Sequence, residues 1–200
     1  MVSMYFPKEE YEDRWRRVHV NMKAKGYGAA VVWGRSAGSY DRSGDVLYLT
    51  NFYSGHSAHE DDTPIWQARS CAAVILRDGQ TPELHMDEAG FPEDLLATRH
   101  RWHMGPIKGV IDALTARGIS GKVALVGSDT LPMKYWRQLE AAMPGIQWVP
   151  EVKLVLEVRR KQGARELDCL REGGALAYIR CSHGDRMQYW TREPLTGYST

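Results

Sequence analysis

Three short, uninterrupted apolar runs constrain the fold most strongly. They are AAVVW at residues 29–33, SCAAVIL at residues 70–76 and VALV at residues 123–126. Runs of this length and composition are typical of strands that are buried on both faces of a sheet. Both faces of such a sheet must be covered by helices, so the sequence predicts an α/β domain.

Helical and further strand patterns surround these runs. Apolar side chains recur at helical spacing at about residues 11–22, 107–114 and 132–143. Additional strands are predicted at residues 46–50, 82–86 and 146–149. Because Asp78-Gly79 is a turn signal, the strand at 82–86 should return beside 70–76 as a hairpin. The predicted architecture is a mixed β-sheet flanked by helices on both faces.

The last fifty residues differ in pattern. We expect the α/β domain to span residues 1–150, and residues 151–200 to form a linker helix and the start of a following segment. The helical stripe of this linker is Leu167, Leu170, Gly174, Ala177 and Cys181. If these side chains are not covered, the helix exposes an apolar surface, which favours self-association.

Composition excludes several classes of protein. Among 200 residues, 43% are hydrophobic and 26% charged, with a formal net charge of +1. This charge gives no reason to expect nucleic acid or an anionic membrane as a partner. Neither a transmembrane run nor a secretory signal is apparent. Cys71, Cys169 and Cys181 form no CxxC motif, so the expected location is the reducing cytoplasm.

A G-x-S-x-G match, Gly34 to Gly38, raises the possibility of a serine hydrolase that uses Ser36. A nucleophile elbow needs a strand before the serine and a helix that starts at it. The sequence SYDRSGD that follows has no helical stripe. The alternative interpretation is a flexible glycine loop. No G-x-G-x-x-G or P-loop motif supports nucleotide binding.

Residues 54–66, SGHSAHEDDTPIW, concentrate charge and histidine. A metal site is one interpretation, although the order is His-x-x-His-Glu rather than HExxH. A solvated loop is the second, and a loop that serves another subunit's active site is the third. His100 and His103 in RHRWH are flanked by arginines, which favours a surface or anion contact over a cation site. Trp102 lies in the same polar surroundings and is a candidate for ligand or partner contact.

Taken in order, several motifs resemble the N-terminal domain of the creatinase/aminopeptidase P family of pita-bread hydrolases. LYLTNF resembles the family's Tyr-Leu-Thr-Gly-Phe stretch, with Asn51 where glycine is common. VRRKQGAREL resembles the family's Arg-x-x-Lys-Ser-x-x-Glu-Leu linker, with Gln162 in place of serine. The final segment TREPLTGYST is similar to the approach to the catalytic domain. The resemblance spans nearly the whole chain.

This resemblance implies a ribonuclease-H-like α/β domain with no catalytic residues, metal or other cofactor of its own. The family's chemistry lies in a C-terminal domain, which holds two divalent metals in aminopeptidases and a catalytic histidine in creatinase. That domain is not expected within residues 1–200.

The resemblance also implies a homodimer, in which one subunit's N-terminal domain leans over the other's active site. The loop after LYLTNF then supplies candidates for a substrate rim. These candidates are His56, His59, Glu60, Asp61, Asp62, Trp66 and Arg69. A stand-alone binding module of the same fold is the alternative.

Overall fold

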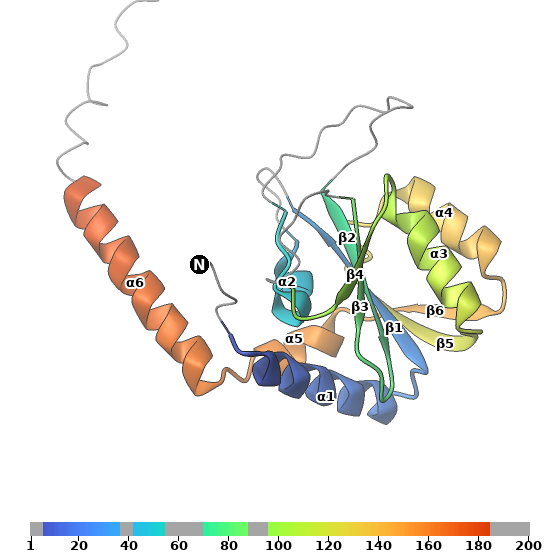
Figure 1. The fold of residues 1–200 in the computed structure, drawn as a ribbon, viewed down its shortest axis with the longest axis horizontal. Helices are drawn as coiled ribbons and strands as arrows, with labels where there is room; N and C mark the ends of the chain where they lie inside the picture. The colour runs from blue at the N-terminus through green and yellow to red at the C-terminus, as the bar shows by residue number, and fades with distance from the viewer. Residues whose placement is uncertain (1–5, 37–41, 55–69, 88–95, 185–200) are drawn as a thin grey trace, which may run out of the picture. The chain divides into compact units, whose positions relative to one another are not determined.

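A computed structural model describes residues 6–36, 42–54, 70–87 and 96–184, and the side chains of these residues as far as 176. The chain divides into two compact units, residues 1–160 and 161–200. The first unit contains one mixed sheet with helices on both faces (Figure 1). It extends through Arg160, whereas the predicted domain ended at residue 150.

The sheet has six strands in the order β4-β3-β2-β1-β5-β6. Their bounds are β1 Ala29–Arg35, β2 Cys71–Arg77, β3 Glu83–Met86, β4 Arg99–Trp102, β5 Gly121–Val126 and β6 Ile146–Pro150. β1, β2 and β3 form an antiparallel meander, and β5 and β6 are parallel to β1 on its other side. This is the predicted ribonuclease-H-like arrangement, with β4 added in parallel at the edge beside β3.

Two layers of helices cover the sheet. α1 (Lys8–Ala24), α2 (Gly44–Thr50) and α5 (Lys153–Arg159) lie on one face, and α3 (Pro106–Ala116) and α4 (Met133–Ala142) on the other (Figure 1). Along β1, Ala30 and Val32 enter the first core while Val31 and Trp33 enter the second. This alternation follows from the two-residue period of a strand. The predicted α/β class is therefore confirmed.

The prediction of a strand at residues 46–50 is wrong, because these residues form most of α2. Val46 and Leu49 are fully buried three positions apart, a spacing that also fits one face of a helix. The Thr50 hydroxyl bonds back to the Val46 carbonyl at 2.7 Å. Over so short an apolar run, periodicity does not separate a strand from a helix.

The second unit contains α6 (Ala164–Gly184), in the segment where the sequence predicted a long helix. The Glu166 carboxylate accepts a hydrogen bond from the Gly163 amide at 2.8 Å, which satisfies one free donor at the helix start. Leu167, Leu170 and Leu176 are all exposed. Among the helices of the described ranges, none is long and apolar enough to cross a membrane.

Candidate functional site

One end of segment 55–69 lies where β1 ends and β2 begins. Ser70 precedes β2 and is held in place by backbone bonding, since its carbonyl accepts a hydrogen bond from the Ser36 amide at 2.9 Å. Both carboxylate oxygens of Asp87 lie 3.1 Å from the Cys71 amide. Asp87 is itself buried and donates its own amide to the Cys71 carbonyl at 3.3 Å. The end of the segment at Ser70 is thus fixed to two strands.

The other end of the segment leaves from the C-terminus of α2. Asn51 ends that helix in the left-handed conformation, with φ 65° and ψ 10°. Its side chain accepts a hydrogen bond from the Tyr11 hydroxyl at 3.0 Å. Glycine and asparagine adopt this conformation most readily, which explains why Asn51 can stand where the resembled family has glycine. Phe52 is buried directly after the turn, and so is Ser54.

Side chains of α1 satisfy the last carbonyls of α2. Arg14 Nη1 donates to the Tyr48 carbonyl at 2.9 Å, and Trp15 Nε1 donates to the Leu49 carbonyl at 2.8 Å. The Arg14 guanidinium also lies 4.3 Å from the centre of the Tyr48 ring. Helix C-termini otherwise leave such carbonyls without partners. α2 is therefore attached to α1 as well as to the sheet.

Replacing Arg14 with methionine should destabilise the protein by about 2 kcal/mol. The Tyr48 carbonyl loses a charged donor, and the Tyr48 ring loses its contact with the guanidinium. Amide hydrogen exchange should accelerate in α2 more than in the sheet. Arg16→Met on the same helix is the matched control, since the Arg16 side chain is 72% exposed and should change stability by about 0.5 kcal/mol or less. Equal effects of both variants would contradict the attachment of α2 by Arg14.

The predicted rim residues lie outside the described residues. They are His56, His59, Glu60, Asp61, Asp62, Trp66 and Arg69. The structure describes the two residues that flank the segment, Ser54 and Ser70, which are both buried, and it describes no geometry for the rim itself.

The G-x-S-x-G match receives a structural explanation for its first glycine. A Cβ on Gly34 would lie 2.6 Å from Val46 Cγ2, so glycine is needed where α2 packs on β1. Ser36 is only 2% exposed, which leaves little access for a substrate. Neither observation supports Ser36 as a nucleophile.

A second polar cluster joins β3, β4 and α3. His85 is fully buried on β3, and its Nδ1 lies 3.0 Å from His103 Nε2, with the two rings stacked. Glu83 forms ion pairs with Arg101, at 2.9 Å, and with Arg117. The pKa of His85 is lowered to about 4, chiefly by burial. The Glu83 carboxylate opposes this shift, and the charges of His103, Arg117 and Arg101 contribute to it. His85 is therefore neutral at pH 7.

Sequence reasoning identified His103 in this cluster but missed Glu83 and His85. The available signal was their alternation with Leu84 and Met86 in ELHM. A strand with this pattern places its polar side chains on one face. That face packs against α3, where a Cβ on Gly109 would lie 2.2 Å from His103 Nε2.

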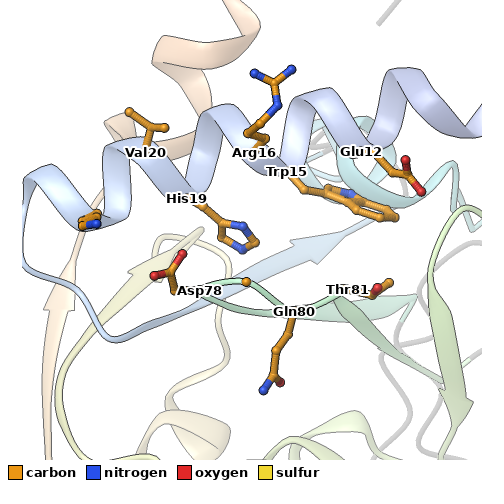
Figure 2. Close-up of a pocket in the computed structure, with 10 residues that line it drawn as sticks. Glu12, Trp15, Arg16, His19, Val20, Asp78, Gln80 and Thr81 are labelled. Carbon is orange, nitrogen blue, oxygen red and sulfur yellow. The ribbon is translucent and has the colours of Figure 1, made fainter.

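A third feature is an open groove of about 510 Å³ between α1 and the turn that joins β2 to β3. Figure 2 shows Trp15 and His19 reaching down from α1, with Asp78 and Thr81 on the opposite wall. Burial lowers the pKa of His19, and Asp78 partly opposes that effect. Within the described part of the chain, no group of three or more His, Cys, Asp or Glu residues could hold a metal ion.

Comparisons with known proteins show which proteins share this fold. No known family profile and no curated protein sequence matches the chain. Solved structures do match. An Xaa-Pro dipeptidase from Bacillus anthracis aligns with a TM-score of 0.58 at 16% identity, over 81% of this chain and 39% of that one. The N-terminal domain of the cytoplasmic peptidase PepQ from Mycobacterium tuberculosis aligns with a TM-score of 0.53 at 14% identity, over 73% of this chain and 98% of that domain.

The chain has the fold of an Xaa-Pro peptidase N-terminal domain. An Xaa-Pro aminopeptidase structure from Streptococcus pyogenes agrees, with a TM-score of 0.50 at 18% identity over 76% of this chain and 99% of that one. The predicted resemblance is confirmed at the level of the fold. The match accounts for nearly all of the PepQ domain but for less than half of the Bacillus anthracis dipeptidase.

Proposed function

We propose that this chain is the non-catalytic N-terminal domain of a creatinase- or Xaa-Pro-peptidase-like C–N hydrolase. In this proposal the enzyme is a cytoplasmic homodimer, and segment 55–69 contributes to the substrate rim of the neighbouring subunit. Bond cleavage takes place in a separate pita-bread domain. Any metal that the reaction needs is held there, outside residues 1–200.

The support for this proposal is the double attachment of segment 55–69 to a fold of this type. The Ser70 carbonyl accepts a hydrogen bond from Ser36, directly after β1, and Ser70 leads into β2, whose first amide is bound by Asp87. The Ser54 end follows a helix held by α1. A loop fixed at both ends by a rigid scaffold can present side chains at a reproducible position. The segment carries two histidines, three carboxylates and a tryptophan, side chains suited to a small polar substrate.

The proposal is tested in the complete dimeric hydrolase that contains this domain. A combined His56→Ala, His59→Ala and Trp66→Ala variant should lower kcat/KM by roughly 10- to 100-fold, because substrate positioning contributes to transition-state binding. Lys108→Ala combined with Arg137→Ala, on exposed positions of α3 and α4, is the control and should leave kcat/KM unchanged. Residues 1–200 alone should show no turnover.

Mixed dimers test whether the rim acts across the subunit boundary. One subunit carries the altered rim and an intact catalytic domain, and the other carries an intact rim and an inactivated catalytic domain. If the rim acts in trans, the intact rim serves the intact catalytic domain and activity returns toward half of that of the unaltered dimer. If activity stays at the level of the rim variant, or if the rim variant itself retains full kcat/KM, the proposed role of segment 55–69 is wrong.

A further inference from the structure

A second groove of about 510 Å³ lies beside the edge strand β4. None of the residues that line it belongs to segment 55–69. The residues that line it are Glu83, Arg99, His100, Arg101 and Arg117. Three of the five are arginines, and Glu83 is the one carboxylate among these described lining residues. Taken as formal charges, three positive groups and one negative group leave an excess of two positive charges around the groove.

The fold explains why these arginines gather. Arg99 and Arg101 are alternate residues of β4, so both side chains lie on the same face of the sheet. Arg117 follows α3, which packs on that face, and its Nη1 donates to the Ala113 carbonyl at 2.9 Å. The groove is therefore built by an edge strand and a helix end, both parts of the same compact unit.

Glu83 positions two of the arginines without using all of their donors. One of its oxygens pairs with Arg101 Nε at 2.9 Å, and the other pairs with Arg117 Nη2. The Arg101 side chain is 68% exposed, and its two terminal nitrogens make no hydrogen bond to the described residues. A guanidinium held through Nε can still present its terminal N–H groups to a ligand.

Arg99 adds a guanidinium that no carboxylate among the described residues neutralises. It is exposed, and it has no ion pair or hydrogen bond with any described residue, although Glu83 is its partner in the β3–β4 register. Both carboxylate oxygens of Glu83 are already taken by Arg101 and Arg117. Arg99 and the terminal nitrogens of Arg101 are thus available donors on the same face of one strand.

We propose that this groove binds a small divalent oxyanion, a phosphate or a dicarboxylate, through the guanidinium groups of Arg99 and Arg101. Glu83, which is itself paired with Arg117, acts as the positioning residue that holds Arg101. The planar fork of arginine matches the paired oxygens of carboxylate and phosphate groups. A dianion also balances the two excess positive charges of the lining. The site does not depend on the proposed role of segment 55–69.

Titrations of residues 1–200 with sodium phosphate and with sodium succinate, at constant ionic strength, test the proposal. The amide NMR signals of β4 should shift and saturate, with a Kd of roughly 0.1–1 mM for a solvent-exposed site. A tighter Kd for phosphate assigns the site to phosphate groups, and a tighter Kd for succinate assigns it to dicarboxylates. Absence of saturation with both anions overturns the proposal.

Substitutions distinguish a built site from general attraction to positive charge. Arg99→Gln should weaken binding about tenfold or more, and Arg99→Lys by less, because lysine keeps the charge but loses the fork. Arg137→Gln on α4 removes the same charge from another exposed position and should leave Kd unchanged. Equal weakening by Arg99→Gln and Arg137→Gln would overturn the assignment to this groove.

The neighbouring histidine provides a readout inside the folded protein. The pKa of His103 is lowered by burial and next by the charge of Arg101. A bound dianion offsets that charge, so the pKa of His103 should rise when phosphate or succinate is present at saturation. The shift should disappear in Arg99→Gln at the same anion concentration. A His103 pKa that does not respond to a saturating anion places the ligand elsewhere.

Discussion

Replacing Gly127 with alanine should lower the free energy of unfolding by about 3 kcal/mol or more, because the new side chain meets backbone. Gly127 follows β5 with φ 77°, and a Cβ built there lies 2.1 Å from the Trp33 carbonyl oxygen of β1. That oxygen belongs to central strand β1, in which Trp33 pairs with Ala73 of β2 and the preceding Val32 pairs with Val126 of β5, so it cannot move away without disturbing the sheet. The parallel contact between β1 and β5 depends on this glycine.

Gly118→Ala separates the steric part of this effect from the conformational part. Gly118 has a similar conformation, with φ 59°, but a Cβ there would meet nothing within 4 Å. Its substitution should cost only about 1 kcal/mol, the ordinary penalty of a left-handed alanine. Urea unfolding of both variants measures the difference. If both variants lose the same stability, the predicted clash with Trp33 is absent.

The elements that sequence predicted correctly are those with a strong apolar pattern. β1, β2 and β5 coincide with the three apolar runs, since these central strands are buried on both faces. α1 was also predictable, because its buried residues recur at helical spacing over several turns. In these segments the local order of apolar residues reflects which side chains are buried, so the pattern within one segment is sufficient to predict its secondary structure.

The elements that were missed lack such a local signal. β4 reads RHRW and is largely exposed, and it is a strand because β3 offers its edge for pairing. α2 reads as a strand, and the side chains that satisfy its carbonyls, Arg14 and Trp15, come from α1, far away in sequence. Tertiary contacts decide both elements, and local propensity is a weak guide in such cases.

The polar clusters could be predicted only in part, for the same reason. His103 was visible as a candidate for anion contact, but its partner His85 lies 18 positions earlier, and Glu83 lies 34 positions before Arg117. The pairing requires β4 to lie beside β3 and α3 to pack on that face. The groove beside β4 therefore became visible only with the fold.

Acidification from about pH 7 to about pH 4 should remove about 3 kcal/mol of stability through His85. The ordinary pKa of histidine, 6.5, applies to the unfolded chain, whereas burial lowers the pKa of His85 in the folded protein to about 4. Between these two values the unfolded state binds a proton that the folded state excludes. The stability is thus fully present above pH 6.5 and is lost progressively as the pH falls toward 4. The groups that face His85 are Glu83, His103, Arg117 and Arg101; burial is the largest cause of the lowered pKa, and the Glu83 carboxylate opposes it.

His85→Gln provides the comparison, because glutamine can hydrogen-bond to His103 but does not titrate. The variant should be less stable at neutral pH, owing to altered packing in a fully buried site, yet its free energy of unfolding should fall less steeply between pH 6.5 and pH 4. His19→Gln is the matched control, since the pKa of His19 is also lowered by burial but its side chain lies at the open groove of Figure 2. Its substitution should flatten the pH dependence by a smaller amount. A pH dependence of His85→Gln that matches the unaltered protein would mean that His85 takes up its proton without unfolding, and that the stacked histidine pair is open to water.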